Sequence, residues 1–403
     1  MRSMVSRLAA ARVLPIGLAL FLSASAATAQ QKLTVQVVNN VVLVPVRVND
    51  RDLSFLLDTG SERSVVDSSI AQEMHLSPSG NVDLLKDYRV QEGTVVTVNG
   101  MSLGTQAFKQ QTLAVIELAP VSRALGVSVE GVLGSDMLQR ITFSLNYSKQ
   151  ELVIGPLGGE KKLGQVIHLR RSGNDFFVPT HMMSVPVELL LDTGTNSTNL
   201  SWNTWHKLVA KWTPTSIVGG VMRAGAATPP AFLVCLPSLS LEDTVLNDQA
   251  VRVQPKIGSG VFSEPTFGGI LGSEVLRQFE VAFDLPHNRI FVKKDPGYRV
   301  DPYRYTTVGI QFAHSGDGYG VVSVWENSPA DRAGIKIEDR LIAINGQPTS
   351  SMSPEQLSAR LHGEAGTPVN LIVERNGSMQ AVTLHIRQLL CEPRNPALRA
   401  AKK

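Results

Sequence analysis

The tripeptide Asp-Thr-Gly occurs twice in this sequence, each time at the end of an apolar run. LSFLLDTG places it at residues 58–60, and VELLLDTG places it at residues 192–194. A single copy is most simply explained as a turn, because Asp side chains start turns and Gly adopts backbone angles that other residues avoid. Two copies after similar runs instead predict that the carboxylates of Asp58 and Asp192 act together.

The two tripeptides lie at matching positions of an internal repeat. A Val-Pro pair at residues 44–45 precedes the first tripeptide by the same interval as the pair at 178–179 precedes the second. Further along, GVLGSDML at 131–138 matches GGILGSEVL at 268–276. Repeats of this kind indicate duplicated structural units.

A pseudo-twofold relation between two such units would bring equivalent loop tips face to face. Two carboxylates held that close cannot both ionise cheaply, so they share one proton and titrate as a pair. The ionised member can take a proton from water, while the protonated member can donate to a peptide carbonyl. The pair therefore predicts acid-base hydrolysis of a peptide bond without a metal, a cofactor or a covalent intermediate.

These features resemble the single-chain, two-lobed form of the retropepsin/pepsin superfamily of aspartic proteases. The resemblance rests on two Asp-Thr-Gly loops, each followed by an apolar-apolar-Gly motif at residues 132–134 and 270–272. It implies two pseudo-symmetric, closed β-barrel lobes with Asp58 and Asp192 as the catalytic pair between them. It also implies supporting roles: cross-lobe hydrogen bonds for Thr59 and Thr193, tight loops for Gly60 and Gly194, and packing behind the aspartates for the segments at Gly134 and Gly272.

The residues after the two loop glycines, Ser61 and Thr195, both carry hydroxyls. A hydroxyl that donates to a carboxylate favours the charged form and lowers its pKa. We therefore expect activity to favour acidic pH, with a maximum below about pH 7, since unperturbed carboxyl pKa values lie near 4. Members of the superfamily also close a β-hairpin flap over the substrate; the candidates are residues 84–93, which include Tyr88, and residues 217–230.

The elements that position the two loops are short strands. Runs such as LTVQVV, VVLVPVRV and ITFSL alternate or are apolar, and Gly, Asn, Asp and Pro separate them, which indicates a mainly β fold. Short helices are expected at SSIAQEM, at NTWHKLVAKW, and in the segments that start at Ser135 and Ser273. We expect the first lobe at residues 30–156, a linker at 157–174 and the second lobe at 175–295.

A different pattern begins near residue 306, where strands alternate with one good helix, SPEQLSARLHG. We expect a linker at 296–305 and a separate α+β domain at 306–388. The segment SPADRAGIKIEDRLIAINGQ resembles a PDZ domain. In that family a loop offers backbone N–H groups to a peptide C-terminus, and the next strand pairs with the peptide. The corresponding loop here consists of Gly309, Ile310, Gln311 and Phe312.

This loop departs from the PDZ pattern, because Gln311 stands where the family has a second glycine. A packing or dimerisation module is therefore the alternative interpretation of the domain. A second competing motif is GMSLG at residues 100–104, which matches the nucleophile elbow of serine hydrolases. That elbow must join a strand to a helix. The Asn-Gly turn signal before it and the strand-like run after it instead place Ser102 in a hairpin.

Residues 1–29 have the features of a secretory signal peptide: three arginines, an apolar run and the small residues Ala-Thr-Ala. An uncleaved membrane anchor is the alternative, but the apolar run is shorter than the ~20 residues that span a bilayer. Without this segment 35 basic residues face 35 acidic ones, so charge does not support nucleic-acid or membrane binding. We expect export, most simply to the periplasm, and a solvated basic tail at 389–403.

The two cysteines, Cys235 and Cys391, show no metal-ligand spacing. They could form one disulfide in an oxidising compartment, or both could be free. No HExxH motif occurs among the eight histidines, so neither a zinc site nor any other cofactor is expected.

The leading hypothesis is an exported aspartic endopeptidase whose PDZ domain docks a substrate or partner. Its partners would be a peptide or protein in the interlobe cleft and a peptide C-terminus at the PDZ domain. A non-catalytic peptide-binding protein that uses the same cleft is the alternative, and a serine hydrolase acting through Ser102 is the third.

Overall fold

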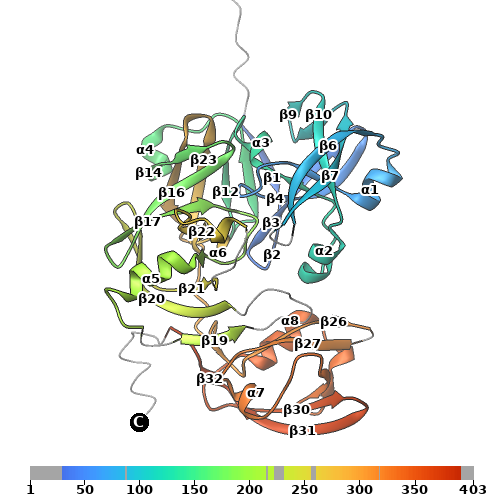
Figure 1. The fold of residues 1–403 in the computed structure, drawn as a ribbon, viewed down its shortest axis with the longest axis vertical. Helices are drawn as coiled ribbons and strands as arrows, with labels where there is room; N and C mark the ends of the chain where they lie inside the picture. Colours follow the sequence, from blue (N-terminus) through green and yellow to red (C-terminus); the bar gives the residue numbers. More distant parts are fainter. Residues whose placement is uncertain are drawn as a thin grey trace, which may run out of the picture.

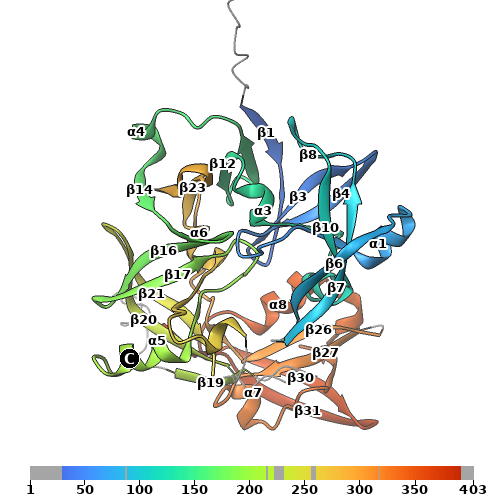
Figure 2. The same ribbon diagram turned by 45° about the horizontal axis from the view of Figure 1, so that its top comes forward.

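The computed structural model describes residues 30–86, 89–214, 217–221, 231–255, 260–316 and 318–391. The fold is mainly β, as the sequence pattern predicted. Two β lobes lie side by side, and a smaller C-terminal unit lies below them in the view of Figure 1. Figure 2 shows the same unit from a second direction, with its strand β26 on the side of the first lobe.

The first lobe is built on one sheet with the strand order β6-β7-β10-β5-β11-β4-β3-β8-β9, and β2 pairs with β3. Its strands are β2 (Gln36–Val38), β3 (Val41–Val48), β4 (Arg51–Leu57), β5 (Val65–Asp67), β6 (Pro78–Lys86), β7 (Arg89–Val98), β8 (Met101–Leu103), β9 (Gln106–Phe108), β10 (Gln111–Ile116) and β11 (Gly131–Leu133). Its helices are α1 (Ser68–Glu73), α2 (Ala119–Leu125) and α3 (Ser135–Leu138). The predicted apolar ramp is β4, whose last three residues are buried.

The second lobe repeats the inner strand order of the first. Its order is β15-β16-β17-β22-β18-β21-β20-β19, so that β16, β17, β22, β18, β21 and β20 stand where the first lobe has β3, β4, β11, β5, β10 and β7. The strands are β15 (Arg170–Ser172), β16 (Asp175–Met182), β17 (Val185–Leu191), β18 (Asn199–Leu200), β19 (Ile217–Val221), β20 (Ala231–Leu241), β21 (Thr244–Val253) and β22 (Gly269–Leu271). Its helices are α5 (Trp202–Val209), η1 (Val261–Ser263) and α6 (Ser273–Leu276).

An additional pairing joins β16 to β20 in this second sheet. The pairings among the described residues of the first sheet form an open path. The closed barrels expected of both lobes therefore stay a prediction, while the mainly β architecture is established.

A third sheet joins the two lobes. It consists of β1 (Gln31–Thr34), β13 (Glu151–Ile154), β12 (Thr142–Asn146), β23 (Phe279–Asp284), β24 (Arg289–Lys294) and β14 (Gln165–His168), in that order. The lobes meet where β12 pairs with β23, and there the rings of Phe143 and Phe283 stack with centroids 4.5 Å apart. One buried apolar cluster runs through both lobes. The lobes thus share a core, which holds their facing loops in a fixed relation.

The segment expected to be the interlobe linker contains two strands and a short helix, α4 (Glu160–Leu163). Strand β14 pairs with β24 in the joining sheet, and β15 pairs with β16 in the second lobe. Within the predicted linker at 157–174, residues 165–168 and 170–172 are therefore strands of these two sheets. The sequence pattern does not indicate strand β15, because all three of its residues are polar and exposed and show no alternation of apolar and polar side chains.

The C-terminal unit has its own sheet and its own core. The sheet runs β26-β27-β28-β30-β31, and β29 pairs with β28. Its elements are β25 (Thr306–Thr307), β26 (Ile310–Ser315), β27 (Gly318–Val324), α7 (Pro329–Arg332), β28 (Arg340–Ile344), β29 (Gln347–Pro348), η3 (Thr349–Ser351), α8 (Pro354–Leu361), β30 (Pro368–Arg375), β31 (Ser378–His385) and β32 (Arg387–Gln388). The predicted helix is α8, which Ser353 and Gln356 start with a capping box.

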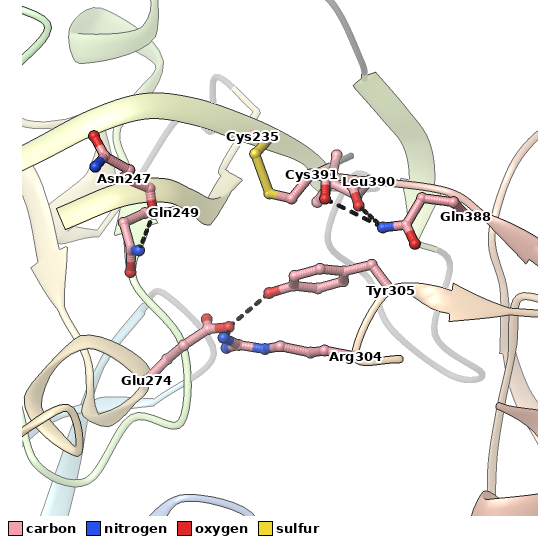
Figure 3. Close-up of a disulfide and its surroundings, with 9 residues drawn as sticks. All are labelled: Cys235, Asn247, Gln249, Glu274, Arg304, Tyr305, Gln388, Leu390 and Cys391. Atoms are coloured by element: carbon pink, nitrogen blue, oxygen red, sulfur yellow. Dashed lines mark hydrogen bonds and ion pairs between the residues drawn. A yellow bond between two sulfur atoms is a disulfide. The ribbon is translucent and has the colours of Figure 1, made fainter. Parts of the chain in front are cut away.

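This unit is fastened to the second lobe by a disulfide between Cys235 of β20 and Cys391, which decides between the two states that the sequence allowed (Figure 3). Trp325 of the C-terminal unit packs with Val218 and Leu390 in one buried cluster. Residues 389–391, expected to begin a solvated tail, are thus partly to fully buried against the second lobe. Residues 392–403 of the predicted tail lie outside the described part of the chain.

Removing the disulfide should loosen this attachment. A cross-link restricts the unfolded chain, and this one closes a separation of 156 residues, so the double variant Cys235→Ser/Cys391→Ser is expected to lose roughly 3 kcal/mol of stability. Thermal unfolding of the oxidised wild type and the double variant measures the loss. An unchanged melting temperature would show that the buried cluster alone holds the C-terminal unit in place.

Candidate active site

The two Asp-Thr-Gly loops leave their lobes from equivalent strands. Each aspartate directly follows a buried strand, β4 or β17, that has a parallel neighbour, β11 or β22. The ladder continues into the loops: the Asp58 N–H donates to Leu133 O at 3.0 Å, and the Asp192 N–H donates to Leu271 O at 3.1 Å. The apolar ramps and the apolar-apolar-Gly motifs of the sequence are therefore the two parallel strands that fix each aspartate.

The two threonines bind each other's loops across the lobe interface. The Thr59 N–H donates to Thr193 Oγ1 at 3.1 Å, and the Thr193 N–H donates to Thr59 Oγ1 at 3.1 Å. Each hydroxyl then donates to a carbonyl of the opposite lobe: Thr59 to Leu191 O at 2.8 Å and Thr193 to Leu57 O at 2.7 Å. Both threonines are fully buried, so these four bonds tie the loops together where water does not compete.

The aspartates of the two loops face each other's glycines. Asp58 Oδ1 accepts from the N–H groups of Gly60 and Ser61 at 2.9 and 3.0 Å, and Asp192 Oδ1 accepts from the next two residues of its own loop at 2.8 and 2.9 Å. A Cβ atom on Gly194 would lie 2.3 Å from Asp58 Cγ, and one on Gly60 would lie 2.5 Å from Asp192 Cγ. The loop tips are therefore in contact, and a residue without a side chain is required at each glycine.

Burial and the neighbouring carboxylate perturb the pKa values of Asp58 and Asp192. Asp192 is 8% exposed. Burial first, and then the charge of Asp192, raise the pKa of Asp58 well above its usual range. Burial also raises the pKa of Asp192, against the opposing effect of hydrogen bonds from the side chain and backbone of Thr195. This additional donor favours the charge on Asp192 and the shared proton on Asp58.

The two hydroxyls after the glycines do not play equivalent roles. Ser61 Oγ donates to Arg63 O at 2.8 Å, so only the backbone N–H of Ser61 serves Asp58. Thr195 does lower the pKa of Asp192, but the effect of burial is larger. The expectation that a hydroxyl lowers the pKa of its aspartate is therefore confirmed for Thr195 and wrong for Ser61, and burial moves both pKa values upward overall.

Gly134 and Gly272 pack against the chain that follows each aspartate. A Cβ atom on Gly134 would lie 2.6 Å from the Arg63 carbonyl, and one on Gly272 would lie 2.2 Å from Ser197 O. The next residues, Ser135 and Ser273, begin the short helices α3 and α6.

These two serines carry roles that the sequence interpretation missed. Ser135 Oγ donates to Thr59 O at 2.6 Å, and Ser273 Oγ donates to Thr193 O at 3.0 Å. Tyr147 adds a hydrogen bond to Ser273 at 3.0 Å, and no tyrosine among the described residues makes the equivalent bond to Ser135. The Gly-Ser pair common to both repeats was the available signal for the serines.

The position after each serine shows where the lobes differ. In the first lobe Asp136 accepts from Ser64 Oγ at 2.7 Å, within the lobe. The corresponding Glu274 of the second lobe instead pairs with Arg304 and accepts from the Tyr305 hydroxyl at 2.7 Å (Figure 3). Both partners belong to the segment expected to be a linker, so the C-terminal unit is anchored one residue from Ser273.

The remaining predicted residues belong to other described elements or lie outside the described part of the chain. Ser102 is in strand β8, which pairs with β3 and β9, and no helix follows it as a nucleophile elbow requires. Residues 84–86 and 89–93 belong to the β6–β7 hairpin, while Tyr88 lies outside the described residues. Of the second flap candidate, residues 217–221 form β19, and 222–230 lie outside the described residues.

The loop expected to bind a peptide carboxylate is partly occupied by the chain itself. Gly309 has a φ of 86°, and its N–H donates to Thr307 Oγ1 at 3.2 Å. The following strand, β26, is an edge strand in its sheet, since β27 is its partner among the described strands. An edge strand of this kind has free backbone groups for a further strand.

Among the described residues, no group of three or more His, Cys, Asp or Glu side chains is placed to hold a metal ion. The same part of the chain contains no helix that is long and apolar enough to cross a membrane.

Known protein families match both lobes and the C-terminal unit. The sequence matches the aspartyl protease family at residues 44–137 and 178–275, once in each lobe, and the PDZ domain family at residues 320–375. Among curated proteins it is similar to a probable CtpA-like serine protease of Staphylococcus saprophyticus, with 28% identity over 80 residues, which is 20% of this chain and 16% of that protein.

It is also similar to the carboxy-terminal processing protease CtpA of Bacillus subtilis, with 34% identity over 70 residues, or 17% of this chain and 15% of the relative. CtpB of the same organism is 28% identical over 68 residues, or 17% and 14% of the two chains. The chain thus spans about a sixth of the length of these relatives.

Proposed function

We propose that the chain, which matches the aspartyl protease family once in each lobe and the PDZ domain family in its C-terminal unit, is an aspartic endopeptidase. One observation carries the proposal: two carboxylates, the half-buried Asp58 and the buried Asp192, stand on facing loops that the Thr59–Thr193 hydrogen bonds lock together. Binding alone would not require two carboxylates that raise each other's cost of ionisation.

The two carboxylates have different roles in the proposed reaction. Asp192, which has the additional hydroxyl donor, is the base: it takes a proton from a water molecule whose oxygen attacks the scissile carbonyl carbon. Asp58 holds the shared proton and donates it to the carbonyl oxygen. The tetrahedral intermediate then collapses: Asp192 gives the proton it took from water to the nitrogen as the C–N bond breaks, and Asp58 takes back a proton from one hydroxyl as the new carboxyl group forms. The closed-barrel form of each lobe, with the cleft between them, is part of this proposal.

The PDZ domain is proposed to dock a substrate or a partner protein. The edge of β26, which has no strand partner among the described residues, supports strand addition by a peptide, whereas the internal bond from the Gly309 N–H to Thr307 Oγ1 weakens the case for carboxylate recognition. The proposal places the protein outside the cytoplasm, most simply in the periplasm after removal of residues 1–29. The Cys235–Cys391 disulfide supports an oxidising compartment.

Digestion of a peptide library between about pH 3 and pH 8 tests the proposed function. We expect internal cleavage beside large apolar residues, inhibition by a peptide that contains a statine group, and a maximum below about pH 7, since one carboxyl of the pair must keep its proton. Ser102→Ala should cleave as the wild type does. Cleavage that ignores statine peptides but is lost in Ser102→Ala would establish a serine hydrolase instead, and binding without cleavage would establish a peptide-binding protein.

A further inference from the structure

Two asparagines at equivalent places in the two lobes reach across the lobe interface. Asn40 lies in the turn between β2 and β3, and Asn174 lies in the turn between β15 and β16. Asn174 follows Asn40 by 134 residues, the separation that also relates the two Asp-Thr-Gly loops. Each asparagine stands four residues before a Val-Pro pair.

The side-chain amides of the two asparagines make the same bond in opposite directions. Asn40 Nδ2 donates to Asn196 O at 3.3 Å, and Asn174 Nδ2 donates to Glu62 O at 3.0 Å. These acceptors are equivalent, because Glu62 follows Asp58 by four residues and Asn196 follows Asp192 by four residues. Each lobe therefore holds the aspartate loop of the other lobe.

The amide oxygens of the asparagines are also bound at equivalent positions. Asn40 Oδ1 accepts from Arg277 Nη1 at 2.6 Å, and Asn174 Oδ1 accepts from Gln139 Nε2 at 3.0 Å. Gln139 and Arg277 each follow the glycine of the apolar-apolar-Gly motif by five residues. The donors come from the lobe whose loop is held, so each asparagine connects two parts of the opposite lobe.

The span of these bonds separates them from ordinary turn chemistry. An asparagine in a turn typically bonds its own backbone two residues away. Asn40 instead bonds a carbonyl 156 residues away, and Asn174 bonds one 112 residues away. The side chains of Glu62 and Asn196 are exposed, so this end of each loop is not held by core packing.

We propose that Asn40 and Asn174 are positioning residues, each of which holds the aspartate loop of the opposite lobe through the carbonyl four residues after the aspartate. The buried threonine bonds fix the beginning of each loop, and the asparagine bonds fix its end. Together they keep the N–H groups that donate to the aspartates in place. The catalytic part of this inference rests on the proposed peptidase function.

The test uses Asn40→Gly, Asn174→Ala and a matched control, Asn39→Gly. Asn39 and Asn40 both have left-handed backbone angles, with φ of 47° and 71°, so glycine relieves the same strain at both positions. Among the described residues Asn39 makes no side-chain hydrogen bond, whereas Asn40 makes the two interlobe hydrogen bonds, to Asn196 and with Arg277. The control therefore separates the effect of relieving strain in the turn from the effect of losing the Asn40 hydrogen bonds.

Hydrogen exchange of the backbone amides gives a readout that does not depend on activity. In Asn40→Gly we expect exchange at Gly194 and Thr195 of the second lobe to quicken about fivefold or more, with the first-lobe loop unchanged, because a net hydrogen bond is worth about 1 kcal/mol. In Asn174→Ala we expect the reverse, with quickening at Gly60 and Ser61. Asn39→Gly should change neither loop.

Kinetics on a cleaved peptide provide the second readout. Asn40→Gly and Asn174→Ala should each lower kcat about tenfold and change KM less than about twofold. The loop that loses the asparagine hydrogen bond carries the reacting carboxylate rather than the surface that binds the rest of the peptide. Melting temperatures establish that the variants are folded at the assay temperature.

The outcomes separate this inference from the proposed function. If the wild type cleaves no peptide, the proposed function fails, while the crossed exchange pattern still decides the positioning role. If the wild type is active but exchange in both loops stays at the wild-type rate, or quickens only in the lobe that carries the substitution, the positioning role is overturned and the peptidase proposal stands.

Discussion

Asn in place of Asp192 should reduce kcat for peptide cleavage about 10³-fold, and Asn in place of Asp58 should have an effect of the same order. A positioned acid or base contributes about 10² to 10⁴ in rate, and an amide can neither take the proton of water nor return it. The hydrogen bonds from Gly194 and Thr195 end on one oxygen of Asp192, so the amide oxygen of Asn can still accept them. The loss should therefore fall on catalysis and leave the loop intact.

The pH dependence of stability supplies an independent check on these variants. The pKa of Asp58 is raised in the folded chain, so the folded chain binds this proton more tightly than the unfolded chain does. Stability that is present below the unfolded value, near 4, is lost as the pH rises toward the raised value. Asp58→Asn removes this loss. At pH 7 the variant should be at least as stable as the wild type, and the difference should shrink toward pH 3.

Asp243→Asn is the matched control, since it removes the same charge from the exposed turn between β20 and β21. It should keep the activity of the wild type. Peptide cleavage that survives in both Asp58→Asn and Asp192→Asn would falsify the catalytic roles. A variant that is inactive and also less stable at pH 7 would show that the carboxylates hold the loops rather than perform chemistry.

The parts of the site that the sequence predicts are those that the repeat marks twice. Asp58 and Asp192, their threonines and glycines, and the segments at Gly134 and Gly272 all occur at matched positions, and chemistry gives each residue type a distinct use. Asn40 and Asn174 are also matched, but asparagine is common in turns, so the sequence offers no reason to expect them across the interface. Their role follows only from the packing of the two lobes.

Other features depend on contacts that have no counterpart in the repeat. Ser61 and Thr195 both carry hydroxyls, yet the Ser61 hydroxyl donates its hydrogen bond to the Arg63 carbonyl rather than to Asp58. Cys235 and Cys391 pair because the C-terminal unit packs on β20 through Trp325 and Leu390. Neither the direction of a hydroxyl nor the docking of one unit on another is encoded in a local pattern.

Alanine at Gly194 is expected to lower kcat about 10²-fold or more, because its methyl group would lie 2.3 Å from Asp58 Cγ. Such a contact forces the opposing carboxylate aside, and a displacement of about 1 Å at a reacting group can cost about 10²-fold in rate. Gly60→Ala should act on Asp192 in the same way, at 2.5 Å from its Cγ. Initial rates on the same peptide measure both losses.

The same displacement should change the pH dependence, which separates it from simple unfolding. Repulsion by Asp192 is the second contribution to the raised pKa of Asp58 after burial. As the carboxylates move apart this contribution weakens, so the proton leaves at lower pH and the alkaline limb of the remaining activity shifts downward. Gly100→Ala, where an added Cβ meets nothing within 4 Å, should keep both rate and profile. Wild-type rate and profile in Gly194→Ala would mean that the two loop tips do not touch in the working enzyme.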